Sequence, residues 1–341
     1  MIKFIISDDF KKRYLSFLSS DLFKNQSKIS KSDYWDFYSK KFNNSLKGNR
    51  LEIKGESGFY FSDNDFLINI KKSIKKFYDF FDFTKPRYLT YKEAFKRSIQ
   101  KKNLDNGRII HPEKCFIKNF EEIKKKYPFK NFSIDEHTIR SYYYINLINN
   151  YLNLSNLNSI LEIGPGSCNL ISLLKAHFNI KNFILIDLPE TLTSTIPIIN
   201  NLFPDSKILF PNENFDKIDQ SLIEKYDFIF LTPSQLNTMS ENIVDLSINT
   251  DSFQEMNLEQ VNLYLALIQR ASKKNSYFFI KNRVEKIPFS SRENINKLNI
   301  KPTKFSDYKF YKNEIKFFEI CDFSLDVQKY PMFIRLEKIL K

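Results

Sequence analysis

The stretch ILEIGPGSCN, residues 160–169, decides the fold of this chain. It holds two of the chain's six glycines, Gly164 and Gly166. The apolar segment ahead of them is typical of a buried strand, and apolar residues at helical spacing over 170–178 predict a helix. Strand, glycine turn and helix form a βα unit whose backbone can approach a nucleotide-like ligand. The glycines lack Cβ atoms, and the helix N-terminus offers free N–H groups.

A second apolar run, FILID at 183–187, ends in an acid that lies 23 residues beyond Gly164. In such folds a carboxylate about 20 residues past the first glycine accepts hydrogen bonds from ribose hydroxyls. The spacing favours this role for Asp187, with Leu188 beside it against the same ligand. The alternative is that Asp187 is a plain helix N-cap, because Pro189 and Glu190 are typical of a first helical turn.

The glycine spacing narrows the class of ligand. A dinucleotide fingerprint requires a third glycine at position 169, where this chain has Asn169. The order Glu-x-Gly-x-Gly resembles instead the first motif of class I S-adenosylmethionine-dependent methyltransferases. The resemblance implies that Glu162 points toward the methionine end of that cofactor, with Gly164 and Gly166 against it. The third glycine usual in that family would fall at Cys168, where this sequence departs from the pattern.

Apolar runs and helical periodicity alternate through residues 131–341. This alternation predicts an α/β fold with a doubly wound, mostly parallel sheet, Rossmann-like as in class I methyltransferases, whose ligands lie at the carboxyl ends of the strands. The helix after Asp187 is expected to break near Pro197. Further expected elements are strands at 207–210, 226–231, 243–248 and 277–280, a helix at 258–271, and an antiparallel edge from 315–323 and 332–339.

Residues 1–130 differ in character, being aromatic and charged with few strand-like runs. Phe10, Tyr14 and Phe17 recur at helical spacing. We therefore predict a mainly helical N-terminal domain that serves as a substrate lid or an oligomerisation element. Aromatics such as Trp35 could stack on a sugar ring, although packing in a core is the more common role for such residues.

Polar side chains follow the strand expected at 243–248. Asn249 and Ser252 could bind substrate, and Asp251 and Glu255 are candidates to take a proton from a hydroxyl nucleophile, a step worth roughly 10²–10⁴-fold in rate. The alternative is that Ser252-x-x-Glu255 is a capping box without chemistry. Both can hold at once, because a cap can still face a cleft.

Two further sets of polar residues lie at element ends. Asn282 and Arg283 leave the strand at 277–280 and could bind substrate hydroxyls or an anionic group. His137 lies in the first turn of a helix that the capping box at 133–136 opens. A plain surface or core histidine is the favoured interpretation there, and a catalytic base at the cleft rim is the alternative.

Taken together, DLPETL at 187–192, NTDSFQEM at 249–256 and the Asn-Arg pair at 282–283 resemble a sugar O-methyltransferase family associated with bacterial surface-polysaccharide gene clusters. The resemblance covers residues 130–290. It implies an S-adenosylmethionine-dependent O-methyltransferase acting on a sugar hydroxyl of a surface-polysaccharide or glycan precursor. The catalytic base does not carry over from the family.

The amino-acid composition bears on the alternative functions. A net charge of +13 invites a nucleic-acid partner, and an RNA methyltransferase is one alternative function. Nucleic acid is not expected, however, because arginine, the residue preferred for phosphate and guanine contacts, is scarce beside lysine. A non-catalytic protein on a methyltransferase fold is another alternative, and a ligand pocket blocked around Cys168 would be its sign.

Cysteine usage and apolar runs bear on the compartment. The three cysteines are far apart, which fits a reducing compartment and gives no zinc spacing, and no metal site is expected. No apolar stretch approaches the roughly 20 residues of a membrane span. We therefore expect a cytoplasmic protein.

Overall fold

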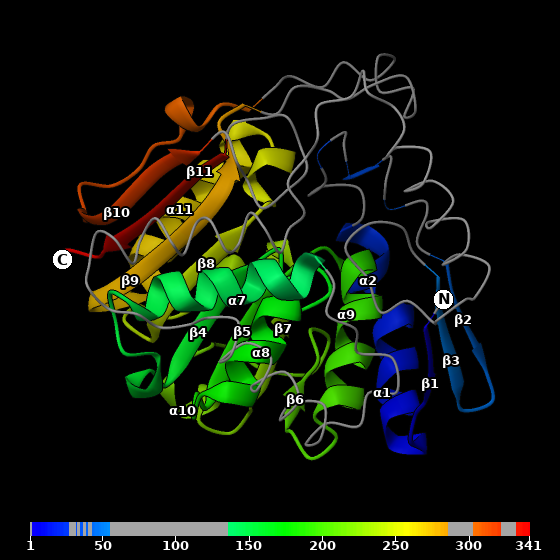
Figure 1. Ribbon diagram of the computed structural model, residues 1–341. Coiled ribbons are helices and arrows are strands. Elements are labelled where there is room, and N and C mark those ends of the chain that lie inside the picture. The colour runs from blue at the N-terminus through cyan, green and yellow to red at the C-terminus, as the bar shows by residue number, and fades with distance from the viewer. Residues whose placement is uncertain are drawn as a thin grey trace, which may run out of the picture.

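An eight-stranded sheet forms the core of the computed structural model (Figure 1). The model describes residues 2–26, 32, 35, 36, 39, 43–54, 136–285, 303–321 and 332–341. Strand order is β10-β11-β9-β8-β4-β5-β7-β6. Neighbours pair in parallel except at β9–β11 and β10–β11, which confirms the predicted doubly wound, mostly parallel sheet and its antiparallel edge. The strands are β4 (Ser159–Ile163), β5 (Asn182–Ile186), β6 (Ile208–Leu209), β7 (Phe228–Leu231), β8 (Val244–Thr250), β9 (Ser272–Arg283), β10 (Glu314–Cys321) and β11 (Met332–Lys338).

Helices cover both faces of this sheet, so its central strands are buried on both sides and are apolar almost throughout. Figure 1 shows α7 (Glu136–Asn149) and α8 (Asn169–His177) on one face and α11 (Leu258–Ala271) on the other. The chain passes from β4 to β5 on one side and returns to β8 on the other side of β4. A crevice is expected at such a reversal, at the carboxyl ends of the strands. Among the described helices, none is both long and apolar enough to cross a membrane.

The predicted break at Pro197 is wrong, because α9 runs unbroken over Pro189–Leu202. A proline inside a helix lacks the N–H that would bond the carbonyl four residues earlier, here that of Thr193. The hydroxyl of Tyr14 donates to this carbonyl over 2.9 Å. Tyr14 comes from α1 (Asp8–Ser19), so a distant segment satisfies the group that the proline leaves open.

The described front part contains a three-stranded antiparallel sheet that the sequence did not predict. Its order is β1 (Ile2–Ile5), β3 (Arg50–Lys54) and β2 (Asn43–Lys47). The predicted helix around Phe10 is confirmed as α1, which α2 (Asp21–Gln26) follows. The proposed domain boundary near residue 130 lies outside the described residues and stays a prediction.

Arg13 of α1 joins the front part to the β6 edge of the large sheet. Its guanidinium donates Nε to Glu213 Oε1 over 2.6 Å and Nη2 to Glu213 Oε2 over 3.0 Å. Nη2 also donates to the carbonyl of Ile208 over 2.5 Å, and the guanidinium lies 4.5 Å from the ring centre of Phe210. This planar, bidentate contact fixes orientation as well as position.

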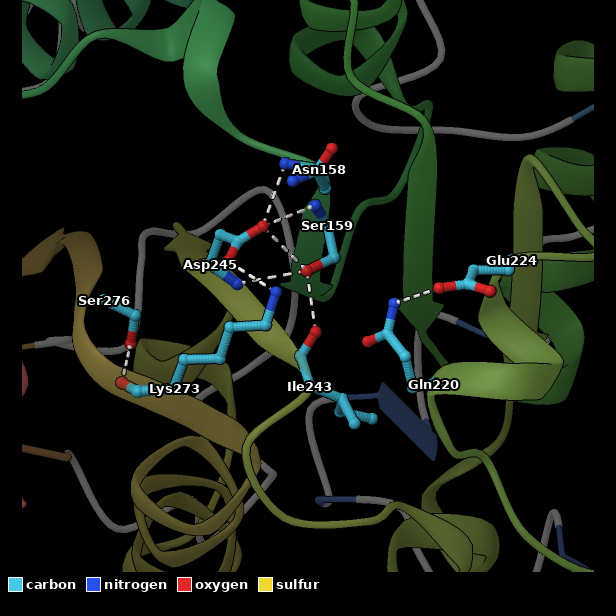
Figure 2. A network of polar contacts seen from close by, with 8 residues as sticks. All are labelled: Asn158, Ser159, Gln220, Glu224, Ile243, Asp245, Lys273 and Ser276. Carbon is cyan, nitrogen blue, oxygen red and sulfur yellow. Dashed lines mark hydrogen bonds and ion pairs between the residues drawn. The ribbon is translucent and has the colours of Figure 1, made fainter.

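A polar network ties β4 to β8 at the end of the sheet opposite the crevice (Figure 2). Asp245 Oδ2 accepts from the backbone N–H groups of Asn158 and Ser159 at 2.9 and 3.0 Å. Its other oxygen pairs with Lys273 Nζ at 2.7 Å, and the Ser159 hydroxyl donates to the carbonyl of Ile243 over 2.7 Å. The strands β4 and β8, which flank the crevice, are thus held together at their N-terminal ends.

Candidate active site

A cavity of about 740 Å³ opens at the carboxyl ends of β4, β5, β8 and β9. Its volume falls within the roughly 300–1,000 Å³ typical of small-molecule sites. The structure brings most of the predicted site residues to its wall. They are Glu162, Gly164, Gly166, Asp187, Leu188, Asp251, Ser252, Glu255 and Arg283.

The glycine turn has the backbone conformation that glycine favours. Gly164 has φ +72° and Gly166 has φ +53°. A Cβ at Gly164 would lie 2.4 Å from the side chain of Ser252, whereas a Cβ at Gly166 would meet nothing within 4 Å. Cys168, where the family's third glycine would stand, also adopts a left-handed φ of +56°. Its side chain is buried in the apolar core and does not line the cavity, so the blockage expected of a non-catalytic protein is absent there.

Asp187 holds the glycine turn from the tip of β5. Its Oδ2 accepts from the Gly166 N–H at 3.0 Å, and its Oδ1 accepts from the Leu188 N–H at 2.7 Å. Burial raises the pKa of this carboxyl to about 7, although the two backbone hydrogen bonds oppose the rise. The N-cap of α9 is Leu188, so the alternative role of Asp187 as helix cap is wrong.

Glu162 is a buried carboxylate beside the cavity, and one of its oxygens lacks a partner. The residue is 2% exposed, and Oε2 has no hydrogen-bond partner in the described structure. Burial, and then the charge of Asp187, raises the pKa of Glu162 to about 8. Asn169, which lines the cavity, also carries a buried oxygen, Oδ1, without a partner in the described structure. A ligand that supplies donors would relieve the free-energy penalty of these groups.

Asp251 stands at the end of β8 between two cations. Its Oδ1 lies 2.7 Å from Lys281 Nζ, and its Oδ2 lies 3.5 Å from Arg140 Nη1. Lys281 is 2% exposed, and Asp251 itself has a left-handed φ of +62°. Such a conformation costs a non-glycine residue roughly 1–3 kcal/mol and is concentrated at functional sites. The two cations hold the side chain of Asp251 in place beside the cavity.

The capping-box alternative for Glu255 is wrong. Ser252 makes no side-chain cap, and its hydroxyl donates to the carbonyl of Ile163 over 3.1 Å. The true N-cap of α11 is Asn257, which forms a reciprocal capping box with Gln260. Glu255 is half-buried on the cavity wall.

Asn249 and Asn282 support the site from below. Both are fully buried, and neither lines the cavity, which corrects the expectation that they contact substrate. Asn249 Nδ2 donates to the carbonyl of Ile163 over 2.9 Å, and Asn282 Nδ2 donates to Asn249 Oδ1 over 2.8 Å. Asn282 Oδ1 in turn accepts from the Gln254 N–H at 3.1 Å. This chain of bonds fixes the loop that carries Asp251 and Glu255.

Sequence reasoning placed His137 in a first helical turn, and it lies there in α7, but its side chain is outside the described structure. The cavity residues it missed include Arg140 and Ser32, and it favoured a core role for Trp35. Trp35 lines the cavity, and the Ser32 hydroxyl beside it donates to the carbonyl of Glu255 over 2.5 Å. No local pattern signals these contacts, because they join segments far apart in the chain.

Metal ligands do not converge here. Within the residues that the structure describes, no group of three or more His, Cys, Asp or Glu side chains is placed to hold an ion.

No protein-family model matches this chain, and no curated protein matches it. Solved methyltransferases resemble part of it. They include the N-methyltransferase NodS from Bradyrhizobium japonicum WM9, with 8% identity, 60% of this chain and 97% of that chain covered, and a TM-score of 0.38. A geranyl diphosphate C-methyltransferase from Streptomyces coelicolor A3(2) shares 9% identity over 60% of this chain and 80% of its own, with a TM-score of 0.41. Likeness at this level concerns the course of the backbone, and function has to be argued from the site itself.

Proposed function

We propose that this chain is an S-adenosylmethionine-dependent O-methyltransferase. The observation that carries the proposal is the buried, unpartnered Oε2 of Glu162 beside a glycine turn that is open to the cavity. A buried carboxylate of this kind is stable only with a cationic or donor partner, and the cofactor's methionine end carries an ammonium group. The residues present therefore fit this group.

Four residues would hold the cofactor. Glu162 would accept a hydrogen bond from the ammonium group of the cofactor. Gly164 and Gly166 have no side chains and would let the cofactor approach the backbone of the turn. Asp187 accepts one backbone N–H at each oxygen, and its carboxylate has further acceptor capacity for a ribose hydroxyl. When bound, S-adenosylmethionine supplies an electrophilic methyl group on a sulfonium.

Two carboxylates would act on the acceptor hydroxyl. Asp251, fixed between Lys281 and Arg140, would accept a hydrogen bond and orient the hydroxyl. Glu255 would take the proton, a contribution of roughly 10²–10⁴-fold. Because both oxygens of Asp251 are engaged by cations, we assign it orientation of the hydroxyl and not the proton transfer.

We propose a sugar hydroxyl of a surface-polysaccharide or glycan precursor as the methyl acceptor. The motif resemblance at 187–192 and 249–256 supports this, and so does the place of Trp35 on the cavity wall. An indole face packs well against the C–H face of a sugar ring. The cation of Arg283 on the same wall would suit an anionic group on the precursor.

Calorimetry with S-adenosylhomocysteine tests the cofactor half, and absence of binding by the wild type would refute the proposal. Trp35 is the chain's single tryptophan, so its fluorescence reports on the cavity alone. We expect glycan precursors to change this emission when the cofactor product is present. Labelled cofactor with the organism's own glycan precursors then identifies the product, and label in RNA instead would refute the sugar assignment.

Matched variants distinguish the roles of Glu255 and Asp251. Glu255→Gln should lower turnover at least a hundredfold with little change in cofactor affinity. Asp251→Asn should mainly raise the acceptor KM, because it disturbs orientation. Near-normal turnover of Glu255→Gln would remove that residue from the proton transfer.

A further inference from the structure

The backbone of Gly166 in the glycine turn is held at both its N–H and its carbonyl. The Gly166 N–H donates to Asp187 Oδ2 over 3.0 Å, and the Gly166 carbonyl accepts from Thr195 Oγ1 over 2.6 Å. Thr195 is fully buried in α9. Both holding groups belong to the unit formed by β5 and α9, because Asp187 follows the strand directly and Thr195 lies two turns into the helix.

The hydroxyl of Thr195 has two carbonyls within reach. The Thr191 carbonyl, four residues earlier, lies 3.0 Å away, but the helix already satisfies it through a backbone N–H. The Gly166 carbonyl is nearer at 2.6 Å and belongs to a turn that lines the cavity. The bond to Gly166 is therefore the one that depends on this hydroxyl.

Gly166 is the residue whose backbone needs such support. Its φ is +53°, and nothing lies within 4 Å of the position that a Cβ would occupy, so side-chain packing does not hold it there. A glycine is free to leave this conformation when its hydrogen bonds are lost. The peptide before Gly166 is held by Asp187 and by the Cys168 N–H, which donates to the Pro165 carbonyl over 2.8 Å, and Thr195 holds the peptide after it.

Building on the proposed function, we infer that Thr195 is a positioning residue for cofactor binding. It holds the peptide that follows Gly166 in the orientation that leaves the cavity open, and through Gly166 it helps to keep Asp187 aligned for the ribose. The residue touches neither cofactor nor acceptor. It acts through the carbonyl of Gly166, and a ribose bound to Asp187 would act on the N–H side of the same residue.

The test compares Thr195→Val with Thr193→Val. Both remove a buried hydroxyl from the same helix, but Thr193 Oγ1 donates to the Glu190 carbonyl over 2.6 Å and accepts from Asn44 Nδ2 over 2.7 Å, whereas Thr195 Oγ1 donates to the glycine turn. Two readouts are measured for each full-length variant. One is deuterium exchange of the 164–168 backbone without ligand, and the other is calorimetric affinity for S-adenosylhomocysteine. Thr195→Ser, which keeps the hydroxyl, is the rescue.

We expect Thr195→Val to speed exchange at 164–168 and to weaken S-adenosylhomocysteine binding about tenfold, as loss of one buried hydrogen bond predicts. Thr193→Val should lower stability without either effect, and Thr195→Ser should behave as wild type. Equal exchange and affinity in the two valine variants would overturn the inference. Failure of the wild type to bind while Thr195→Val still speeds exchange would refute the cofactor assignment but support the role of Thr195 in the turn.

Discussion

Replacing Glu162 by glutamine should weaken cofactor binding and raise the free energy of unfolding. Burial raises the pKa of this carboxyl from 4.5 to about 8. One pKa unit corresponds to 1.36 kcal/mol, so the ionised form is disfavoured in the folded, unliganded chain by roughly 5 kcal/mol relative to the unfolded chain. Glutamine keeps the shape of the side chain and removes the charge.

The sign of the pH dependence follows from the direction of the shift. The folded chain binds the Glu162 proton more tightly than the unfolded chain does. Its stabilising contribution is therefore complete below pH 4.5 and is lost as the pH rises through about 8. Between pH 5 and 8.5 the free energy of unfolding of Glu162→Gln should gain on that of the wild type by about 4 kcal/mol. Asp187 titrates in both proteins, so its contribution to the difference between their free energies of unfolding largely cancels.

The assay is urea unfolding from pH 5 to pH 9 combined with calorimetry. We expect Glu162→Gln to bind S-adenosylhomocysteine ten- to a hundredfold more weakly, since a hydrogen bond to a charged group contributes about 1.5–3 kcal/mol. Glu259→Gln, at an exposed position in the first turn of α11, is the control and should change neither quantity. Parallel stability curves for Glu162→Gln and wild type, or equal affinities, would refute the reasoning.

Three other substitutions probe separate parts of the structure. Gly164→Ala should lower the free energy of unfolding by roughly 3 kcal/mol, because the added Cβ would clash with Ser252. Gly48 is the control, since it is also left-handed, at φ +59°, but has open space around it. Gly48→Ala should cost only about 1 kcal/mol in the same urea assay. Asp245→Ala should cost about 3 kcal/mol and leave S-adenosylhomocysteine affinity unchanged, because it lies at the far end of the sheet; a weaker affinity would contradict the separation of the two ends. Tyr14→Phe should cost about 1–3 kcal/mol and speed amide exchange in α9, and unchanged exchange there would show that the hydroxyl is dispensable.

The large sheet could be predicted because its signals are local. A parallel strand buried on both faces is a short apolar run, and the ILEIGPGSCN stretch carries both the strand and the turn that shape the cavity. The helix at 258–271 was predicted at the observed bounds because α11 has a regular apolar stripe. Gly164, Gly166 and Asp187 reached the cavity wall for the same reason, since one βα unit and the next strand place them.

What failed depends on contacts between distant segments. The β2–β3 hairpin was missed because its strands are short and mostly polar: NNSLK has one apolar residue, and RLEIK alternates over only five residues. The helix across Pro197 survives because a tyrosine from α1 satisfies its open carbonyl. Asn249 and Asn282 carry the polar groups of a binding site, yet they bond to each other and to the loop above them. Composition alone does not distinguish a polar group that binds a ligand from one that hydrogen-bonds to other groups of the protein.

The bond between Tyr14 and the Thr193 carbonyl has a consequence for synthesis of the chain. The ribosome makes Tyr14 about 180 residues before its partner, a delay on the order of 10–30 seconds at 5–20 residues per second. Throughout that delay Phe10 lacks its ring partner Phe210, whereas Phe17 can already pack against Phe23 of α2. We therefore expect the nascent chain to rely on chaperones, and a fragment that begins after the front part to emerge with α9 weakened at its middle.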